Sequence, residues 1–600
     1  MKFGLPMREG SLIRPATVVF GCLAGLYGCT DPADAPMPES LHSDVVVVGA
    51  GPAGLAAALE SAAGGASVIV IETNSVGGGH GVMAGGLAMV NTALQQKKNI
   101  QDSPELAYRD WSAYGETNHP EWTRRYAEQS AEMVYDWLTD MGVEFRMILP
   151  TPENTVPRFH FTKGTSVHVV APMLRRAFDH PGIRFLFNHE AEELSQTDGR
   201  VTGLQVRNLR TNVVLAVNAD AVVLATGGFQ GNLDKVRAAW PRQDAFPDKL
   251  LVGGSRFARG AGHDLAAAVN AEFVDLEKQV VFLNGIPNPR DTDRALKASN
   301  PLAIWVNAQG QRFVNEDSSE KVSVAAVLSQ QPASYWAIFD ANGRKKFGVR
   351  DAPWLSRDTI DTEIIRNSEL TRSATSIEQL ASSAGLPAET LAASVATYNR
   401  AVQANNDLEF GRFSALTSKA RGRYKKIEKP PFYAVHLFPM SRKNMGGVAI
   451  DQKGRVMSVA GEPVAGLFAA GELTGVAGIN GGYGMNGTFL GPAVYLGRIA
   501  GKNSLEVIDS NAGDELARTQ TPAAEDQPGN SNAQPAPGSD QLRSLVALGR
   551  QGYWHFENSH RLVLDREYEC AMCHSSDFDF AAAESRQARL AQLDSCTNCH

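Results

Sequence analysis

Two Cys-x-x-Cys-His motifs lie at the end of the chain, at residues 570–574 and 596–600. This motif is typical of covalent c-type haem attachment, in which two cysteines form thioethers and the histidine ligates the iron. Two Cys-x-x-Cys pairs about twenty residues apart also suit a zinc ribbon, which is the alternative. A histidine directly after each pair favours two haems. The residues concerned are Cys570, Cys573, Cys596 and Cys599 for attachment, and His574 and His600 for ligation.

The segment that carries these motifs, residues 543–600, has few aliphatic side chains. A segment this short cannot bury enough apolar surface to fold alone, so two haems would supply most of its core. His555 and His560 precede the first motif and are predicted to be the distal ligands, which would give two bis-histidine irons. The alternative for both is an ordinary surface histidine.

The amino-terminal residues predict export. Lys2, Arg8 and Arg14 give a positive start, and the apolar run that follows at residues 16–28 is too short for a transmembrane helix. Residues 1–28 are therefore predicted to be a secretory signal peptide, followed by a tether at 29–41. The Leu-Tyr-Gly-Cys at 26–29 resembles a bacterial lipoprotein cleavage box, so either Cys29 carries a lipid anchor or the signal is cleaved without lipidation.

The six cysteines agree with this location. Cys22 leaves with the signal, Cys29 sits at the cleavage box, and the other four belong to the haem motifs, which leaves none for a disulfide. C-type haem attachment occurs on the exported side, so we expect a periplasmic protein with a periplasmic or membrane electron donor or acceptor. The formal net charge is -8 and no basic patch is present, so nucleic acid is excluded as a partner.

A glycine-rich loop lies near the other end of the chain. Residues 44–48 predict a buried parallel strand, and Gly49, Gly51 and Gly54 follow it before a predicted helix at 55–63. Glycines at this spacing allow a tight turn and let the backbone approach a pyrophosphate at the helix N-terminus. Glu72 ends the next predicted strand, where a carboxylate can bind adenosine ribose hydroxyls. FAD and NAD both satisfy this pattern.

Further motifs resemble, in the same order, those of the fumarate reductase and succinate dehydrogenase flavoprotein superfamily, which includes flavocytochromes c and ketosteroid dehydrogenases. They are Gly-Gly-Gly-His at 77–80, Ala-Gly-Gly at 84–86, Val-Val-Leu-Ala-Thr-Gly-Gly-Phe at 222–229, Gly-Gln-Arg-Phe-Val-Asn-Glu at 310–316, Met-Gly-Gly-Val at 445–448 and Gly-Leu-Phe-Ala-Ala-Gly-Glu at 466–472. The resemblance covers about residues 43–505 and implies that the cofactor is FAD.

The resemblance also implies which residues hold FAD: Gly49, Gly51, Ala53, Gly54, Glu72, Gly78, Gly79, Ala84, Gly85, Gly86, Ala225, Thr226, Gly227, Gly228, Gly471 and Glu472. In the succinate dehydrogenase branch, a histidine just before the glycine pair carries FAD covalently. Gly79 takes that position here and His80 is one residue away, so we expect non-covalent FAD.

Several positions depart from the fumarate reductases. These enzymes carry an arginine proton donor eight residues after Arg312, and this chain has Glu320 there. The histidine before Met-Gly-Gly is replaced by Lys443, and the arginine of the last loop by Gly481. The His-Pro-Thr tripeptide of the cap is absent around residues 279–282. The groups that would hold a four-carbon dicarboxylate are thus mostly missing, and fumarate and succinate are not the expected substrates.

Other residues at these positions suggest a different chemistry. Tyr483 and Gly487, followed by Leu-Gly-Pro-Ala at 490–493, match the spacing in the ketosteroid dehydrogenase branch. There the phenol and the backbone N–H polarise a ketone; a loop aromatic packing on the flavin is the alternative for Tyr483. Arg442 and Lys443 are expected to bind a substrate anion or to stabilise negative flavin charge. The histidines of the body, such as His160 and His263, are expected to be structural.

The expected fold is α/β. The resemblance implies a Rossmann-like FAD-binding domain with an inserted α+β cap, and the tail adds a small haem-packed C-terminal domain. The expected boundaries are 42–276 and 430–505 for the two parts of the FAD-binding domain, 277–429 for the cap, 506–542 for a flexible linker rich in Pro, Asn, Gln and Ala, and 543–600 for the dihaem domain.

The expected function is an exported FAD- and haem-containing oxidoreductase. Its small-molecule substrate would react at a carbon–carbon bond beside a carbonyl or carboxylate, by alkene reduction or by dehydrogenation, and the haems would exchange electrons with a partner. The alternatives are an electron-transfer flavocytochrome without substrate turnover and a flavoprotein dehydrogenase with a zinc-binding tail.

Overall fold

The computed structural model describes residues 40–163, 166–241, 245–352, 354–413 and 423–518. The predicted signal peptide, Cys29, nearly all of the tether, most of the linker, His555, His560 and both Cys-x-x-Cys-His motifs lie outside the described residues. Within the described part of the chain, no helix has both the length and the apolar character needed to cross a membrane.

The domain expected to bind FAD is built on a sheet with the strand order β20-β21-β9-β1-β2-β6. β1 pairs in parallel with β2 and with β9, so the carboxyl ends of these three strands meet at one edge. Val45, Val46 and Val47 are completely buried, which confirms the buried strand expected there. The strands are β1 (Ser40–Val48), β2 (Val68–Glu72), β6 (Ile183–Phe187), β7 (His189–Thr197), β8 (Arg200–Asn208), β9 (Val214–Leu224), β20 (Arg455–Met457) and β21 (Pro463–Ala469).

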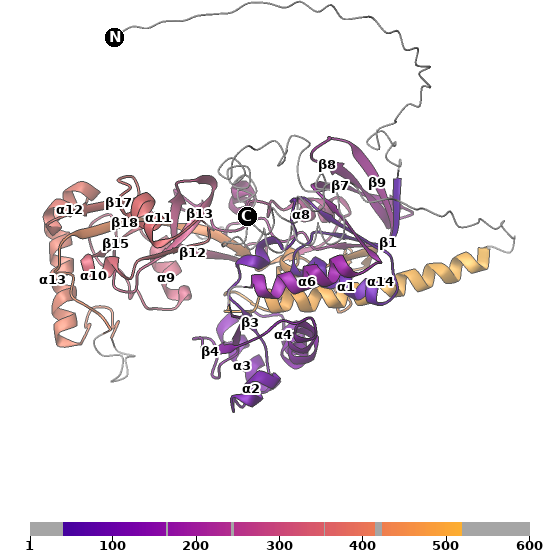
Figure 1. Ribbon diagram of the computed structural model, residues 1–600, viewed down its shortest axis with the longest axis horizontal. Coiled ribbons are helices and arrows are strands. Elements are labelled where there is room, and N and C mark those ends of the chain that lie inside the picture. The colour runs from indigo at the N-terminus through magenta and orange to yellow at the C-terminus, as the bar shows by residue number, and fades with distance from the viewer. Residues whose placement is uncertain (1–39, 164–165, 242–244, 353, 414–422, 519–600) are drawn as a thin grey trace, which may run out of the picture. The chain divides into compact units, whose positions relative to one another are not determined.

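Three helices, α1 (Pro52–Ala63), α6 (Val167–Asp179) and α14 (Leu490–Arg518), lie along one face of this sheet (Figure 1). α14 contacts α1 through glycines: a Cβ at Gly497 would lie 2.2 Å from the Ala53 carbonyl oxygen, and one at Gly501 2.3 Å from that of Ala57. α14 continues to Arg518, so the chain is still helical beyond residue 505, where the sequence motifs predicted the end of this domain. α8 (Ala261–Ala268) packs on the opposite face.

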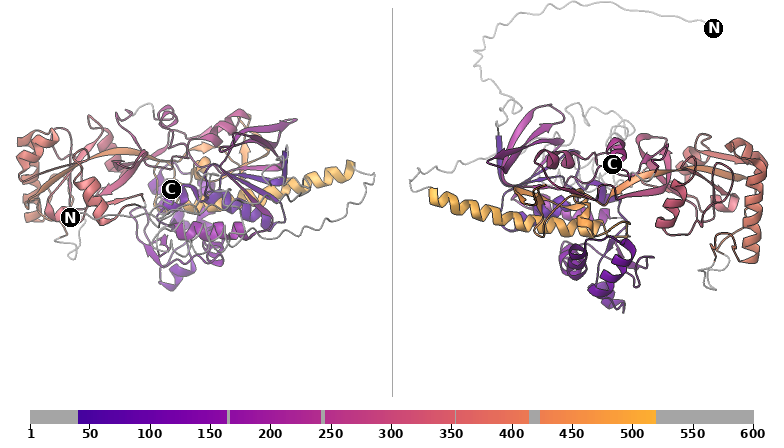
Figure 2. Two further views of the ribbon diagram at one scale, coloured as in Figure 1. Left: turned by 45° about the horizontal axis from the view of Figure 1, so that its top comes forward. Right: turned by 180° about the vertical axis from the view of Figure 1, so that it is seen from behind.

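A second sheet forms the cap, with the order β14-β15-β18-β12-β13-β16, and β10 and β17 also pair with β18. β18 (Phe432–Asn444) has 13 residues and runs from the cap towards the first sheet (Figures 1 and 2). The sequence boundary at residue 430 assigned this strand to the FAD-binding domain, whereas its partners are strands of the cap. The other strands are β10 (Leu251–Val252), β12 (Gln279–Asn288), β13 (Asp291–Ser299), β14 (Ile304–Val306), β15 (Tyr335–Phe339), β16 (Gly348–Arg350) and β17 (Thr371–Ala374).

A buried ion network fixes the start of the cap helix α9 (Glu320–Leu328). Arg312 pairs with Glu316 at 2.8 Å and with Asp407 at 2.8 Å, and Arg412 pairs with Glu316 at 3.1 Å. All four side chains are at most 2% exposed, so each charge depends on its partners for stabilisation. The motif at 310–316 is therefore structural, and it holds the segment that leads to Glu320. The other long cap helices are α12 (Ile377–Ala384) and α13 (Ala388–Ala404).

A third group of elements lies between β2 and α6 in the sequence. It comprises α2 (Ala93–Lys97), α3 (Pro104–Gly115), α4 (Pro120–Ser130) and the small sheet β3 (Leu87–Ala88), β5 (Phe159–Phe161) and β4 (Met147–Leu149). Arg158 is buried at its centre and pairs with Asp102 at 2.7 Å and with Asp110 at 2.6 Å. This group contributes Tyr114 and Glu116 to the candidate site.

Two buried histidines, on β5 and on α8, are neutral in the folded protein. His160 Nδ1 donates to the Arg158 carbonyl at 2.6 Å, and its Nε2 accepts from the Thr92 hydroxyl at 2.8 Å. Neither ring nitrogen of His263 has a hydrogen-bond partner among the described residues. Burial lowers the pKa of each histidine from 6.5 to about 4. Both therefore fit the structural role expected from the sequence.

The protein should lose stability in acid because these histidines protonate more readily when unfolded. The free energy of unfolding should be highest above pH 6.5 and fall as the pH drops towards about 4. His263→Leu should reduce this fall, as measured by denaturant unfolding near pH 7 and near pH 5. His42→Leu, which changes an exposed histidine on β1, is the control. Equal pH slopes for His263→Leu and the parent would contradict the assignment.

Candidate active site

Residues 49–51 form the turn between β1 and α1, at the carboxyl ends of the parallel strands. This turn is one side of an open site that we call the cradle. Gly49 has a φ of 105°, and a Cβ there would lie 2.5 Å from the Ala225 carbonyl oxygen. A Cβ at Gly54 would lie 1.8 Å from the Gly49 carbonyl oxygen, so helix and strand pack closely. A Cβ at Gly51, in contrast, would meet no heavy atom within 4 Å. The N-terminus of α1 therefore opens on a space that a pyrophosphate can enter.

Glu72 ends β2 beside this cradle. Its carboxylate accepts hydrogen bonds from the backbone N–H of Ala50 and of Asn74, each at 2.8 Å. Burial raises the pKa of Glu72. Glu72 also lines a small cavity of about 70 Å³ together with Gly77 and Gly79. A carboxylate fixed here is placed to accept hydrogen bonds from ribose hydroxyls.

Several oxygen atoms converge on the turn after β9. A Cβ at Gly228 would lie 2.0 Å from Asn444 Oδ1, 2.4 Å from Gln230 Oε1 and 2.8 Å from Glu472 Oε1. Gln230 Oε1 and Thr226 Oγ1 are buried and have no hydrogen-bond partner among the described residues. Buried acceptors without donors are rare in folded proteins. The hydroxyls of a sugar-like chain would satisfy them, so the residues present fit FAD with its ribityl chain.

The remaining predicted FAD residues serve this cradle in different ways. Gly227 has a φ of 75° and open space beside it, whereas Ala53 packs against Gly471. Ala225 lies beside Gly49. Gly78 and Gly79 have positive φ values of 117° and 49°, which favour glycine where the succinate dehydrogenase branch has its linking histidine. Farther along, Ala84, Gly85 and Gly86 lead into β3, where a Cβ at Gly86 would lie 2.2 Å from the His160 carbonyl oxygen.

His80 follows these glycines in the short helix Gly79–Met83. Its Nδ1 lies 3.9 Å from Glu472 Oε2, and its Nε2 is buried without a partner among the described residues. Burial, with Arg442 and Lys443 nearby, holds the pKa of His80 well below its usual value. The imidazole is therefore neutral.

Arg442 and Lys443 lie at the end of β18, beside Glu472. Burial lowers the pKa of Lys443 to about 8, and its ammonium lies 4.1 Å from the ring centroid of Phe489. Arg442 donates to the Gly253 carbonyl and lies 3.5 Å from the Asp351 carboxylate. The charges of both cations act on His80 and on Glu472, which suits charge balance at the cofactor.

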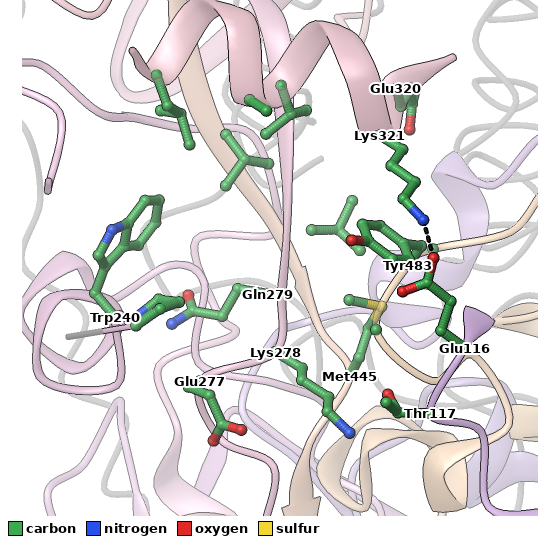
Figure 3. Close-up of a pocket in the computed structure, with 18 of the residues that line it drawn as sticks. Glu116, Thr117, Trp240, Glu277, Lys278, Gln279, Glu320, Lys321, Met445 and Tyr483 are labelled. Atoms are coloured by element: carbon green, nitrogen blue, oxygen red, sulfur yellow. Dashed lines mark hydrogen bonds and ion pairs between the residues drawn. The ribbon is translucent and has the colours of Figure 1, made fainter. Parts of the chain in front are cut away.

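A cavity of about 750 Å³ is lined by Met445, the residue after Asn444, and by residues of the cap and of the loop at 482–484. This volume is within the range of about 300–1,000 Å³ that holds drug-sized ligands. Figure 3 shows Tyr483, Lys321, Glu320 and Glu116 at one side and Trp240 at the other. Apolar side chains form much of the wall: Trp240, Val280, Val281, Val324, Leu328 and Met445. The cavity thus combines an apolar wall with polar side chains on both sides: Tyr483, Lys321, Glu320 and Glu116 on one, and Glu277 and Gln279 near Trp240 on the other.

Contacts to the aromatic ring of Tyr483 hold this residue in the cavity wall. The Lys321 ammonium lies 4.1 Å from the ring centroid and forms an ion pair with Glu116. The ring of Tyr114 meets Tyr483 edge-on, with 6.4 Å between centroids. Glu320 lines the same cavity as the first residue of α9. Two catalytic candidates, Tyr483 and Glu320, therefore come together.

Gly487 has packing contacts with β3. Gly487 does not line the cavity, and its carbonyl oxygen accepts from the Ala88 N–H of β3 at 3.0 Å. A Cβ there would lie 2.3 Å from the Ala88 nitrogen, which explains the glycine with its φ of 83°. Gly487 thus packs against β3 through its carbonyl oxygen, and the role expected for its backbone N–H stays a prediction.

The backbone conformation and close surroundings of Gly481 explain why this chain lacks the arginine that fumarate reductases carry at this position. Its φ is 64°, and a Cβ would lie 2.5 Å from the Gly115 carbonyl oxygen and 2.7 Å from the Asn118 nitrogen. The segment after α3 therefore occupies the space of any side chain at residue 481. Sequence reasoning missed this segment, including Glu116, because no motif marks it.

Comparison with known proteins agrees with the assignment of the cradle as an FAD site. A family model described as FAD binding domain matches residues 44–490. The chain is 31% identical to NADH:fumarate oxidoreductase of Klebsiella pneumoniae over 76% of this chain, and it spans about half, 47%, of that protein. It is 29% identical to a KsdD-like steroid dehydrogenase of Mycobacterium tuberculosis, over 80% of this chain and 99% of the relative. It is 30% identical to vinyl phenol reductase of Lactiplantibacillus plantarum, over 77% and 96%.

Solved structures give the same result. The open conformation of a flavocytochrome c3 fumarate reductase aligns with a TM-score of 0.65 and 28% identity, covering 78% of this chain and 79% of that one. The 3-ketosteroid-Δ4-(5α)-dehydrogenase of Rhodococcus jostii RHA1 aligns with a TM-score of 0.59 and 27% identity, covering 79% and 98%.

The fold and the cradle define an FAD-dependent oxidoreductase. The chain belongs to the FAD binding domain family, within the group of enzymes that act on CH–CH groups.

Proposed function

We propose that the protein is an exported flavocytochrome that acts on the carbon–carbon bond beside a carbonyl of a bulky, mostly apolar substrate. The reaction is alkene reduction or the reverse dehydrogenation. The observation that carries this proposal is the cavity of about 750 Å³, whose wall is in large part apolar and which Tyr483 lines. A phenol in this place can donate a hydrogen bond to a carbonyl oxygen as negative charge develops there.

A small dicarboxylate is a poor match for this cavity. Gly481 leaves no room for an arginine, and the carboxyl groups of Glu116, Glu277 and Glu320 line the wall. Lys321 and Lys278 also line it, but their charges are already paired, with Glu116 and with Asp275. Two substrate carboxylates would therefore meet like charges and two occupied cations, which disfavours their binding.

FAD, when bound in the cradle, exchanges a hydride with the substrate carbon. The residues of this chain orient the two partners: the cradle holds the cofactor, and the cavity walls align the substrate. The charges of Arg442 and Lys443 act on His80 and Glu472 and would favour negative charge on a reduced flavin. We propose that FAD is bound non-covalently, since Gly79 takes the place of the linking histidine.

The Cys-x-x-Cys-His motifs supply the electron route in this proposal. Two haems would pass single electrons between the flavin and a periplasmic or membrane partner, and Cys29 would anchor the protein if it is lipidated. A flavocytochrome, by its name a protein with both a flavin and a cytochrome, shares the fold of the flavin body, which supports the pairing of the two cofactors in one chain.

A turnover screen tests the substrate class. The probes are fumarate, 4-vinylphenol and 4-androstene-3,17-dione, each with reduced methyl viologen as donor and, for the steroid, with a dye acceptor. Turnover of the ketone and negligible fumarate reduction are expected. Robust fumarate reduction would overturn the substrate class, and turnover of 4-vinylphenol alone would remove the carbonyl requirement. A flavin that no probe oxidises or reduces would favour the electron-transfer alternative.

Haem content tests the tail. Changing Cys570 and Cys573 to Ser should halve the haem content in a pyridine haemochrome assay, because one attachment site is lost, while FAD content stays at the parent level. Loss of all haem would mean that the two sites form one folding unit. Unchanged haem content, or zinc without haem in the parent, would contradict the attachment motifs.

A further inference from the structure

We infer that Lys321 of the cap, held by Glu116, is a positioning residue that makes the Tyr483 hydroxyl a stronger hydrogen-bond donor towards the substrate carbonyl. This inference rests on the proposed function, in which Tyr483 polarises the carbonyl, and it adds the two side chains that support the phenol. Neither Lys321 nor Glu116 belongs to a sequence motif, and they come from segments that are about 200 residues apart in the chain.

Lys321 contacts both partners at once. It is the second residue of α9, and its ammonium forms an ion pair with Glu116 while lying 4.1 Å from the ring centroid of Tyr483. A side-chain hydrogen bond also links the ammonium to Tyr483. Figure 3 shows the three side chains together in the cavity wall. The carboxylate of Glu116 therefore fixes a positive charge beside the phenol.

The backbone of Glu116 is strained. Its φ is 63° and its ψ is -43°, and the Thr117 N–H donates to the Gly115 carbonyl oxygen at 2.7 Å, so Glu116 is the central residue of a γ-turn. A γ-turn with positive φ is rare and strained for a residue with a Cβ. The side chains of Glu116 and Lys321 are 52% and 36% exposed, so their ion pair adds little stability that could explain the strain. Strain without a stability gain points to a functional role.

The γ-turn is joined to the loop that carries the phenol. The Gly115 carbonyl oxygen also accepts from the N–H of Gly482 at 2.7 Å, and Gly482 directly precedes Tyr483. Glu116 and Tyr483 are thus held in one unit of the structure, whereas Lys321 belongs to the cap. The phenol gains its neighbouring positive charge only when α9 lies against this unit.

The charge of Lys321 acts through the phenol. The hydrogen bond with Glu116 raises the pKa of Lys321, so the ammonium stays charged at neutral pH. As negative charge develops on the carbonyl oxygen, the Tyr483 hydroxyl donates more strongly and part of the charge passes to the phenol ring. An ammonium over the ring favours that charge. No bond to Lys321 forms or breaks, and Lys321 keeps its proton.

Lys321→Met tests this role, with 4-androstene-3,17-dione and a dye acceptor as the probe reaction. We expect kcat to fall by about 5–30-fold, the range for loss of a cation next to an aromatic ring, with little change in KM, because the charge acts as the oxygen becomes negative. Lys321→Arg keeps the charge and should restore most of kcat. Lys345→Met, which changes an exposed lysine of the cap outside the cavity, is the control. A parent-like kcat in Lys321→Met would overturn the inference.

A double-mutant cycle shows whether Lys321 acts through Tyr483. In a Tyr483→Phe background, Lys321→Met should have little further effect on kcat, because the phenol hydroxyl that it supports is already gone. If the two losses multiply, Lys321 acts on the substrate independently of the phenol, and its role as a positioning residue is overturned.

Glu116→Gly separates function from stability. Glycine adopts positive φ without a steric cost, so the Tm should equal or exceed that of the parent. The kcat should nevertheless fall towards that of Lys321→Met, because the ammonium is no longer held beside the ring. A parent-like kcat would show that Glu116 does not support the phenol. A lower Tm together with a lower kcat would assign Glu116 a structural role, and either result would overturn its part in the inference.

Binding of 4-nitrophenolate gives a measurement that does not need turnover. Its oxygen carries a negative charge like the one that develops on the carbonyl, and the change in its absorbance on binding gives a Kd. Lys321→Met and Tyr483→Phe should each weaken binding, and Lys345→Met should not. No binding by the parent, or the same Kd in the parent and Lys321→Met, would overturn the inference. If the parent turns over no ketone, the proposed substrate class fails, and this measurement alone judges the role of Lys321.

Discussion

Tyr483→Phe should slow turnover of an enone by about 10²–10³-fold in kcat, the cost of removing one hydrogen-bond donor from a developing oxyanion. The ring should stay in place, because its contacts are with the Lys321 ammonium at 4.1 Å and with the edge of Tyr114 at 6.4 Å. The Lys321 ammonium also forms a side-chain hydrogen bond with Tyr483, which the variant loses, but the two ring contacts do not need the hydroxyl. The loss should therefore appear in kcat rather than in the stability of the protein, and steady-state kinetics with 4-androstene-3,17-dione measure it.

Tyr108→Phe is the control for this change. Tyr108 lies on α3, the helix that carries Tyr114, and its ring stacks on Arg124 at 4.2 Å outside the cavity. This variant should keep the parent kcat, and the flavin absorbance of both variants should equal that of the parent. A Tyr483→Phe enzyme with parent-like kcat would remove the phenol from the mechanism and leave Arg442 and Lys443 as the groups to test.

Gly51→Val should abolish FAD retention without unfolding the protein. A Cβ at Gly51 would meet no protein atom within 4 Å, so the side chain fits the protein itself and fills only the space that a pyrophosphate would enter. The purified variant should be colourless, and its circular dichroism should match that of the parent from which FAD has been removed. If the variant had the same flavin absorbance per protein as the parent, the assignment of Gly51 to the FAD site would be contradicted.

Gly54→Val separates this effect from a packing effect. A Cβ at Gly54 would lie 1.8 Å from the Gly49 carbonyl oxygen, so this variant should lose stability together with FAD. In the parent, acid precipitation should release FAD into the supernatant. Flavin that stays in the pellet would show a covalent bond, for which His80 is the nearest residue to examine.

The FAD cradle could be predicted from the sequence because its determinants are local. A run of valines at 45–48, three glycines and Glu72 follow one another within a single strand–turn–helix–strand unit, and each residue type has a backbone reason to be there. Gly49 and Gly54 pack backbone against backbone as expected from their spacing. For such a unit, short-range sequence patterns are sufficient.

The substrate side could not be predicted in the same way. Glu116 and Glu153 belong to segments without a motif, and they reach Lys321 and Asn486 only through the tertiary fold. Gly487 matched a catalytic spacing, but the positive φ that β3 imposes on it is a packing requirement. The sequence boundary at residue 430 placed β18 outside the cap, although β18 belongs to the cap sheet. Pairing between strands that are far apart in the sequence leaves no periodic pattern from which it could be predicted.

β18 also limits how far this protein can be treated as a set of exchangeable modules. The strand pairs with β12, β15 and β17 in the cap, and its last residues include Lys443 and Asn444 beside the cofactor cradle. Grafting a foreign cap at residues 277 and 429 would leave those three strands without their neighbour and β18 without its ladder. Recombination within this family should therefore preserve fold and flavin binding only where the crossover keeps β18 with the cap that it completes.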